Sequence, residues 1–276
     1  MARHWIITGI GSGLGKAMAK AALERGDRVT GLLRNAAAAE SFAGAAPGRS
    51  SARIVDVTDR SAVFAAIAAA EAAAPIDILV NNAANSFEGW IEEAEPDDLR
   101  ALLETNLIAP LHVIQAVLPA MRARRHGHIV NISSGGGILG VPWCGPYSAT
   151  KFALEGLSEA LAQEVKAFGI HVTIVEPGAF RTNLLVRDHP KRAGEIDDYE
   201  QSDAVKMRDL ISAMGGKEHG NPDKFAAAMM TVVDADPPPL RVALGDDAIA
   251  MAATKAKQLM RDIEAWSGVG SGLSYA

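Results

Sequence analysis

The sequence is poor in cysteine, in long apolar runs and in net positive charge. Its 276 residues include one cysteine, Cys144, so no internal disulfide bond can form, which is typical of proteins from a reducing compartment. No run of about 18 apolar residues is present, and this excludes a membrane-spanning helix. The 27 Lys and Arg residues against 33 Asp and Glu give a net charge of −6, so no overall positive field would attract nucleic acid. We therefore expect a cytoplasmic protein that binds neither nucleic acid nor a membrane.

The composition is that of a folded globular protein, with 49% hydrophobic and 22% charged residues. Short β-favouring apolar runs alternate along the chain with segments of helical periodicity. The predicted strands are residues 5–8, 29–33, 53–56, 78–80, 128–132, 171–175 and 241–244. Such alternation predicts an α/β fold, namely a doubly wound, Rossmann-type parallel sheet with helices on both faces. Because the sequence contains no linker or internal repeat, we expect residues 1–276 to form a single domain.

Three further segments are defined by their composition. Residues 184–220 are polar and irregular, and either a solvated loop or a lid over a site would have this composition. Residues 221–276 predict a helix, a strand and a closing helix that complete the domain. A long helical region at 96–125 contains Pro110, which should bend or break it.

A glycine-rich loop follows the first predicted strand. Its glycines do not match the common G-x-G-x-x-G dinucleotide pattern, but the sequence Thr8-Gly9-x-x-x-Gly13-x-Gly15 is present. Glycine lets the backbone approach a ligand closely, and a helix that starts here would direct free N–H groups at a phosphate. The loop therefore predicts a nucleotide-phosphate site, although a tight structural turn would have the same pattern.

The end of the second predicted strand bears on which nucleotide binds. In doubly wound folds an acidic residue at this place binds the ribose 2′-hydroxyl, whereas an arginine accommodates a 2′-phosphate. Arg34 and Asn35 stand here, and no carboxylate does. A charge-assisted hydrogen bond of about 1.5–3 kcal/mol would favour NADP over NAD by roughly ten- to a hundredfold. We expect NADP, with NAD as the less favoured alternative.

Tyr147 and Lys151 are four residues apart in a predicted helix, 147–168, so their side chains share one face. An ammonium about 4 Å from a phenol contributes on the order of 4 kcal/mol at an effective dielectric of about 20. We expect this to lower the pKa of Tyr147 toward the range useful for acid–base catalysis. Ser134, at the end of a predicted strand, would share a substrate oxygen with Tyr147. Asn106, a poor helix former, would distort its helix and hold a water, or simply face solvent.

These features occur together and in a fixed order. The combination resembles the short-chain dehydrogenase/reductase family over nearly all of residues 3–182, and again in the C-terminal strand and helix. The resemblance is carried by Thr8-Gly9-x-x-x-Gly13-x-Gly15, Asp56, Asn81-Asn82-Ala83-Ala84, Asn106, Ser134, Tyr147-x-x-x-Lys151 and Pro177-Gly178. Two departures are small: Gly11 stands where Ala or Ser is common, and Ala84 replaces the Gly that usually ends the Asn-Asn-Ala-Gly motif.

The resemblance implies an enzyme, an NAD(P)-dependent oxidoreductase that interconverts a secondary alcohol and a ketone or aldehyde by hydride transfer. It implies that Tyr147 is the general acid or base, that Lys151 holds the nicotinamide ribose, and that Ser134 polarises the substrate oxygen. Asn106 would support a water in a proton relay. The implied cofactor contacts are Gly9, Gly11, Ser12, Gly13, Leu14, Gly15, Arg34, Asn35, Asp56, Val57, Asn82, Ala83, Ala84, Tyr147, Lys151, Pro177, Gly178, Phe180 and Thr182.

The resemblance also places a cover over the substrate after Thr182, which assigns residues 184–220 as the lid. The residues expected to line the substrate pocket are Gly136, Ile138, Trp143, Cys144, Leu184 and Leu185. They are mostly apolar, so the expected substrate is a hydrophobic alcohol or carbonyl compound, and Cys144 belongs to the wall rather than acting as a nucleophile. The histidines show no metal-ligand spacing, so we expect no metal. A homodimer or homotetramer is expected, as is usual in the family.

Two alternatives stay open at this point. A catalytically idle protein could bind NADP and report redox state to a partner, and the loss of one catalytic residue would favour that reading, but none is lost. The same chemistry could also run with NAD.

Overall fold

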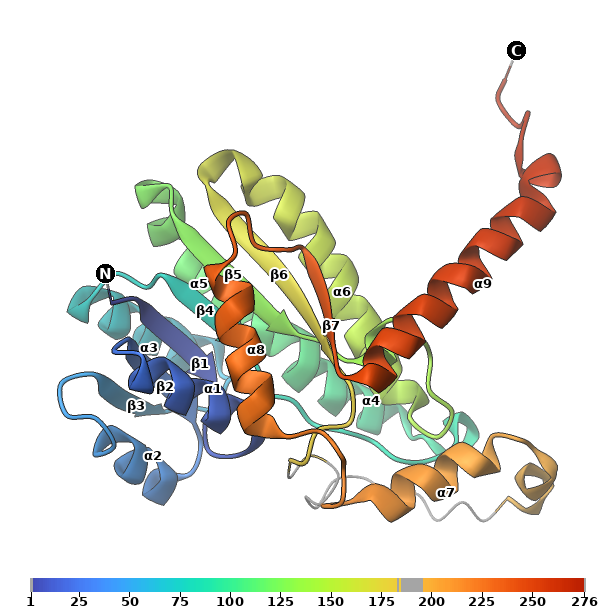
Figure 1. Ribbon diagram of the computed structural model, residues 1–276, viewed down its shortest axis with the longest axis horizontal. Helices are drawn as coiled ribbons and strands as arrows, with labels where there is room; N and C mark the ends of the chain where they lie inside the picture. The colour runs from blue at the N-terminus through green and yellow to red at the C-terminus, as the bar shows by residue number, and fades with distance from the viewer. Residues whose placement is uncertain (1, 183, 185–195, 276) are drawn as a thin grey trace.

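The computed structural model describes residues 2–182, 184 and 196–275, and its centre is a parallel sheet of seven strands. The strands are β1 (His4–Thr8), β2 (Arg28–Leu33), β3 (Ser50–Ile54), β4 (Ile78–Asn81), β5 (Gly127–Ile132), β6 (Ile170–Pro177) and β7 (Arg241–Leu244). Their order across the sheet is β3-β2-β1-β4-β5-β6-β7, and every neighbouring pair is parallel. The predicted doubly wound topology is therefore confirmed (Figure 1).

Helices cover both faces of this sheet (Figure 1). They are α1 (Gly13–Glu24), α2 (Ala36–Ala43), α3 (Arg60–Ala73), α4 (Pro96–Leu103), α5 (Ala109–Arg124), α6 (Gly145–Val165), α7 (Val205–Met214), α8 (Pro222–Asp234) and α9 (Asp246–Gly270). One buried apolar cluster joins the sheet to α1, α2 and α8, and a second joins it to α3, α5 and α6. In β1, Trp5 and Ile7 belong to the first cluster and Ile6 to the second, because successive side chains of a strand point to opposite faces.

Two elements differ in detail from the sequence prediction. The strand expected at 53–56 lies at Ser50–Ile54, where it pairs in register with β2, so Asp56 follows the strand and stands beyond the sheet. The break expected at Pro110 is confirmed, because a π-helical segment, Glu104–Ile108, separates α4 from α5. This segment inserts an irregular turn directly before the proline.

The helical segment Pro96–Arg124 is long and apolar enough to cross a membrane by length and composition alone, with a mean hydropathy of 1.4. This differs from the sequence analysis, which found no sufficiently long apolar run. In the fold, however, α5 packs against α3 and buries Val113, Ile114 and Val117 in the second apolar cluster. These contacts are those of a core helix in a globular domain.

The C-terminal segment forms the predicted helix, strand and closing helix. β7 pairs with β6 and extends the sheet, and α8 packs against α1. α9 is longer than the predicted 248–266, and it projects away from the rest of the molecule (Figure 1). Of the predicted lid, residues 184 and 196–220 are described, and they include a 3₁₀ turn at Asp197–Gln201 and α7.

Candidate active site

The candidate site lies at the carboxyl ends of the parallel strands, where the strand order reverses between β1 and β4. Ligands of open α/β sheets bind at this kind of topological switch point. The glycine loop follows β1, Asn82 follows β4, Ser134 follows β5 and Gly178 follows β6. The fold therefore brings together segments that are far apart in the sequence.

The glycine loop is shaped by positions that only glycine suits. Gly9 and Gly13 have φ angles of +73° and +55°. A Cβ on Gly13 would lie 3.0 Å from the Cβ of Thr182, and one on Gly15 would lie 2.5 Å from the amide nitrogen of Asn82. The loop thus packs directly against Thr182, while α1 begins at Gly13 with its free N–H groups at the loop. This is the geometry of a phosphate cradle.

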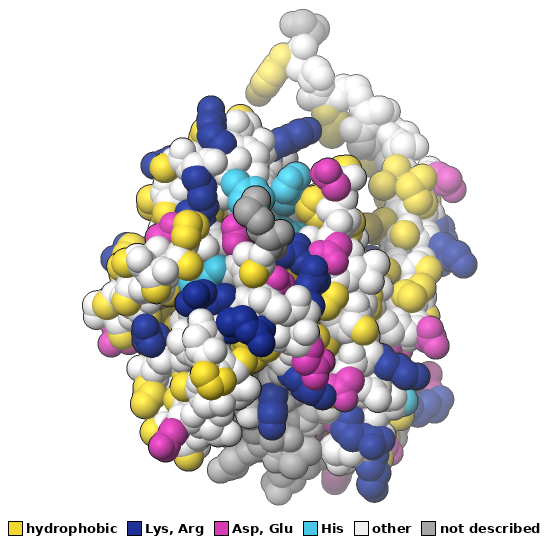
Figure 2. All heavy atoms as spheres, turned by 60° about the vertical axis from the view of Figure 1, so that its left-hand side comes forward, with side chains coloured by type: hydrophobic (Ala, Val, Ile, Leu, Met, Phe, Trp, Pro, Cys, Tyr) yellow, Lys and Arg dark blue, Asp and Glu magenta, His cyan; other side chains and the backbone are white. Residues whose placement is uncertain are grey.

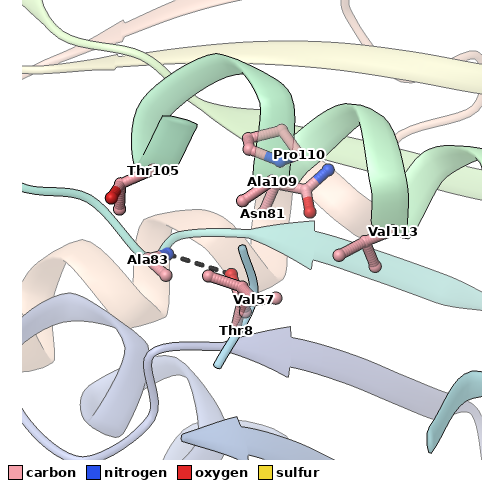
Figure 3. Close-up of a pocket in the computed structure, with 8 residues that line it drawn as sticks. All are labelled: Thr8, Val57, Asn81, Ala83, Thr105, Ala109, Pro110 and Val113. Atoms are coloured by element: carbon pink, nitrogen blue, oxygen red, sulfur yellow. Dashed lines mark hydrogen bonds between the residues drawn. The ribbon is translucent and has the colours of Figure 1, made fainter. Parts of the chain in front are cut away.

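Asn82 holds the start of this loop in place by hydrogen bonds to Thr8. Its side-chain amide donates to the carbonyl oxygen of Thr8 over 2.9 Å, and the backbone N–H groups of Asn82 and Ala83 both donate to the Thr8 hydroxyl over 2.9 Å. Figure 3 shows the bond from Ala83 to Thr8. The side chain of Asn82 therefore helps to fix the shape of the loop, and its expected contact with the cofactor stays a prediction.

A narrow pocket, too small to hold a water molecule, lies between Thr8 and α5. Thr8, Val57 and Ala83 line one side, and the opposite side is formed by α5 with Ala109 and Val113 (Figure 3). Val57 and Ala83 are two of the expected cofactor contacts, and the structure brings them to one pocket. Ala84 lies next in the chain and is half-buried.

Arg34 stands at the end of β2, as the sequence predicts. Its guanidinium lies 3.8 Å from the carboxylate of Asp56, and both side chains are largely exposed. The backbone N–H of Thr58 is the main group that holds the pKa of Asp56 below its usual value, and its hydroxyl adds to the effect. Asn35 accepts a hydrogen bond from the N–H of Ala38 over 2.8 Å, so its side chain caps α2.

Tyr147 and Lys151 share one face of α6. The Lys151 ammonium is 5.7 Å from the centre of the Tyr147 ring and donates to the carbonyl oxygen of Ile132 over 2.9 Å. Burial lowers the pKa of Lys151 to about 8, against the opposing effect of the negative charge on Glu155. Burial raises the pKa of Tyr147 to about 12. The lowered phenol pKa that the sequence analysis expected is therefore wrong for this structure, because removal from water outweighs the opposing effect of the hydrogen bond with Ser134.

Ser134 meets Tyr147 at the end of β5. A hydrogen bond between the two hydroxyl groups acts to lower the phenol pKa. A Cβ on Gly136 would lie 3.5 Å from the Ser134 hydroxyl and 3.6 Å from the Tyr147 ring, so Gly136 belongs to the same spot. The two hydroxyl groups therefore lie together, and their expected sharing of a substrate oxygen stays a prediction.

Asn106 is fully buried in the π-helical segment, which excludes the alternative that it faces solvent. Its side-chain amide donates to the carbonyl oxygen of Asn85 and to the Thr150 hydroxyl, each over 3.0 Å, and its oxygen accepts from the N–H of Asn85. Thr150 in turn donates to the carbonyl oxygen of Tyr147 over 2.8 Å. Asn106 therefore ties the helix distortion to the turn of α6 that carries Tyr147.

The sequence analysis did not predict a role for Glu155, a buried acidic residue near this site. Glu155 is 4% exposed, accepts a hydrogen bond from the Ser133 hydroxyl over 2.6 Å, and pairs with Arg241 of β7. Arg241 also pairs with Glu176 over 2.6 Å, so one guanidinium serves two buried carboxylates. The sequence did contain a signal for Glu155: it follows Lys151 by four residues, which places both side chains on one helix face.

The expected substrate side contains an apolar cluster around Trp143 and Cys144, with Tyr147 packed against it. Trp90, Tyr199 and Ile211 also belong to the cluster and are not in the predicted set. The Trp90 ring stacks on Tyr199 at 4.5 Å and meets Trp143 edge-on at 4.8 Å. No local pattern marks these residues, because they come from distant segments of the chain.

The structure gives less detail for the other predicted substrate residues. Ile138 and Leu184 are half-buried, and Leu185 lies outside the described residues. Burial raises the pKa of Cys144 to about 12, which keeps the thiol protonated and fits a place in the pocket wall. Within the described ranges, no group of three His, Cys, Asp or Glu side chains is arranged to hold a metal ion.

The remaining predicted cofactor contacts surround the loop or serve the fold. Gly11 has no close neighbour that a Cβ would disturb, Ser12 is the N-cap residue of α1, and Leu14 packs on the first apolar cluster. Gly178 follows Pro177 and leaves room for Asp247, whose carboxylate accepts from the N–H of Ala179 over 2.7 Å. Phe180 packs edge-on against Phe225 of α8 at 5.0 Å.

Comparison with known proteins gives consistent matches over the whole chain. A family model described as short chain dehydrogenase matches residues 3–193. Oxidoreductase BOA17 from Botryotinia fuckeliana is 34% identical over 96% of this chain and 97% of its own. A 3-ketodihydrosphingosine reductase from Bacteroides thetaiotaomicron is 37% identical over 87% of each chain.

Solved structures agree with these matches. A short-chain dehydrogenase from Streptomyces avermitilis superimposes with a TM-score of 0.87 and 39% identity, covering 99% of this chain and 98% of its own. ElxO with NADP bound has a TM-score of 0.75 and 26% identity over 91% of this chain and 100% of its own. A 3-ketoacyl-(acyl-carrier-protein) reductase from Brucella melitensis, complexed with NADH, has a TM-score of 0.71 and 27% identity over 87% of this chain and 96% of its own. Structural neighbours therefore bind either nicotinamide dinucleotide.

Proposed function

Since this chain belongs to the short-chain dehydrogenase family and is an NAD(P)-dependent oxidoreductase, we propose that it uses NADP to interconvert a secondary alcohol and a ketone or aldehyde. The observation that carries the proposal is the meeting of Ser134, Tyr147 and Lys151 at the sheet edge that also bears the glycine loop. We also propose that the substrate is hydrophobic, because the cluster around Trp143 is apolar.

The residues present fit a nicotinamide dinucleotide. The positive φ angles of Gly9 and Gly13 and the close packing of Gly13 on Thr182 form a backbone cradle that any larger side chain would fill. Glycine-loop N–H groups at the start of α1 would hold the diphosphate, Val57 and Ala83 the adenine, Lys151 the nicotinamide ribose and Thr182 the carboxamide. When bound, the nicotinamide supplies or accepts the hydride.

Tyr147 moves the proton at its phenolic oxygen. With a pKa of about 12 the phenol keeps its proton at neutral pH, so it is ready to protonate the oxygen of a carbonyl substrate as that oxygen gains negative charge. Ser134, already hydrogen-bonded to the phenol, donates to the same oxygen and orients it. The reverse direction, alcohol oxidation, requires Tyr147 to take the proton back.

Lys151 and Asn106 act through Tyr147. The Lys151 ammonium favours the negatively charged phenolate that remains after the proton has left, and its bond to Ile132 fixes its position. Asn106 holds Thr150 and so the backbone of Tyr147, and the adjoining π-helical turn would support the water of a proton relay. Trp90, Trp143 and Tyr199 exclude bulk water from the substrate side.

The chemistry is tested with Tyr147→Phe. Purified protein is assayed with NADPH and a panel of hydrophobic ketones and aldehydes, and the variant is expected to lose roughly 10²- to 10⁴-fold in kcat while its affinity for NADPH stays unchanged. Tyr275→Phe, in the exposed C-terminal tail, is the matched control. Turnover by Tyr147→Phe at the rate of the unaltered protein contradicts the proposal.

The cofactor preference is tested with Arg34→Ala. Its exposed guanidinium lies at the adenosine end of the site, so the affinity for NADPH should fall by roughly ten- to a hundredfold while that for NADH changes little. Arg60→Ala, an exposed arginine at the start of α3, is the control for a lost surface charge. Equal losses for both dinucleotides would mean that Arg34 does not select a 2′-phosphate, which contradicts the proposed basis of the NADP preference.

A further inference from the structure

The C-terminal helix α9 leaves the body of the protein soon after it begins. Ala248 is its one buried residue, and every described residue from 259 to 275 is exposed. Large apolar side chains lie on this free part: Ile263 is 59% exposed and Trp266 is 67% exposed. Figure 2 shows hydrophobic side chains along the helix, which runs down from the C-terminal tail at the top of the view. A helix with these side chains in water needs a partner.

Apart from Met251, Met260 and Val269, the large apolar residues of α9 follow a heptad pattern that small residues complete. They recur with alternating spacings of three and four residues, at 249, 252, 256, 259, 263, 266 and 270. The residues are Ile249, Ala252, Ala256, Leu259, Ile263, Trp266 and Gly270, which we call the α9 seam. Such spacing is the signature of a helix that pairs with another helix by knobs-into-holes packing.

We propose that the α9 seam pairs with the α9 seam of a second copy of this chain, with the two helices antiparallel. In the pairing that we assign, a two-fold axis passes between Lys257 and Gln258. This sets large residues against small or medium ones across the axis: Leu259 against Ala256 and Ile263 against Ala252 of the second copy. Trp266 meets Ile249 in the same way. Alternation of large and small side chains fills the interface evenly.

The charges beside the seam select this register. Antiparallel pairing places Lys255 opposite Asp262 of the second copy, and symmetry forms the same pair twice. A shift of one heptad in either direction sets Asp262 against Asp262, or Lys255 against Lys255, which is repulsive. In a parallel pair, Lys255 would face Met260 and gain no ion pair. The assigned antiparallel register is therefore the one in which both size and charge agree.

A membrane surface is a poorer partner for this helix. Helices that lie on membranes are rich in Lys and Arg on their polar face. α9 carries three basic residues, Lys255, Lys257 and Arg261, against four acidic ones, which gives the helix a net charge of −1. The acidic residues are Asp246, Asp247, Asp262 and Glu264. Attraction to an anionic bilayer is thus absent, whereas the second copy supplies complementary charge.

The assembly is tested on the full chain by analytical ultracentrifugation over a range of concentrations. Ile263→Glu is expected to halve the mass of the assembly, and its exposed position means that the monomer should fold normally, as circular dichroism would verify. Lys255→Glu and Asp262→Lys should each weaken association by about tenfold. The double variant should regain the original affinity. Lys257→Glu, outside the seam, is the control.

The double variant is the decisive arm, because Lys255 also lies 6.0 Å from the Phe152 ring of its own chain and its single variant could act there. Restoration by Asp262→Lys cannot arise from that contact. A second arm joins the seams directly: Ala256→Cys combined with Leu259→Cys should form covalent dimers on oxidation, whereas either cysteine alone should not. Equal masses for the unaltered chain and Ile263→Glu, or failure of the charge exchange to restore association, overturns the proposal. Flotation of the unaltered chain, but not of Ile263→Glu, with phosphatidylcholine–phosphatidylserine vesicles would overturn it in favour of a membrane.

Discussion

The expected cofactor side and the expected substrate side of the site are built in different ways. On the expected cofactor side, hydrogen bonds between backbone groups and short polar side chains fix the structure. Examples are the bonds from Asn82 and Ala83 to Thr8, at the start of the glycine loop. On the expected substrate side, three aromatic rings, Trp90, Trp143 and Tyr199, come from separate segments and contact one another by ring packing, with one hydrogen bond from the Tyr199 hydroxyl to Glu92. The first arrangement tolerates few residue types and the second tolerates many. The two parts of the site therefore constrain the sequence to different degrees.

The largest expected effect concerns the charge of Lys151, which stands where the two sides meet. Its pKa of about 8 means that the ammonium is lost as the pH rises through that value. If the ammonium supports Tyr147, kcat/KM for carbonyl reduction should fall about tenfold per pH unit above pH 8. The kcat/KM of Lys151→Met should be roughly 10²- to 10⁴-fold lower than that of the unaltered protein at all pH values. A pH–rate profile of both proteins checks this.

Glu155 sharpens the same measurement. Its negative charge raises the pKa of Lys151, so Glu155→Gln should move the fall in activity to lower pH, whereas Glu159→Gln, which is half exposed, should not. Stability should change in the opposite sense to activity. The folded-state pKa of Lys151 lies below its ordinary value of 10.5, so the unfolded chain binds the proton more tightly. The free energy of unfolding should therefore rise between pH 8 and 10.5. A pH–rate profile that stays flat over the same range would contradict the role of Lys151.

A smaller effect is expected from the cofactor side. Gly13→Ala puts a Cβ at a φ of +55°, 3.0 Å from Thr182, so the loop must shift. Strain of about 1–3 kcal/mol should weaken NADPH binding by roughly ten- to a hundredfold, as titration of protein fluorescence can measure. Gly44→Ala, where the nearest atom is 3.8 Å away and the φ is negative, is the matched control. Equal affinities for the two variants would mean that the loop does not hold the dinucleotide.

The same contrast explains how much the sequence could predict. The sheet, the glycine loop and the Ser134–Tyr147 pairing follow local rules, because strand ends, glycine conformations and helical spacing are set by neighbouring residues. The pKa of Tyr147 does not, since burial by distant segments decides it. The hydrogen bond from the Asn82 side chain to Thr8 was not predicted either, because it depends on how two strands far apart in the sequence pack together.

The residues missed by the sequence analysis share one property. Trp90, Tyr199, Ile211 and Arg241 gain their place only when segments more than 40 residues from Tyr147 pack together. Apolar and aromatic residues of this kind occur throughout a core, so their type and spacing carry no mark of a site. Arg241 is a clearer case, since its two buried acidic partners lie on α6 and β6 and become neighbours only in the folded sheet.

The smallest expected effect lies on the substrate side and shows whether packing alone sets specificity. Tyr199→Leu removes the ring that stacks on Trp90 at 4.5 Å, an interaction of about 0.5–1.5 kcal/mol. KM for a bulky hydrophobic ketone should rise by roughly two- to tenfold, while the affinity for NADPH stays constant, because no part of the glycine loop is touched. Tyr199→Phe separates the ring from the hydroxyl, which donates to Glu92 over 3.1 Å, and it should behave like the unaltered protein. If instead Tyr199→Phe raised KM as much as Tyr199→Leu, the polar bond to Glu92 would be what positions the lid, and the two sides of the site would be built by the same means after all.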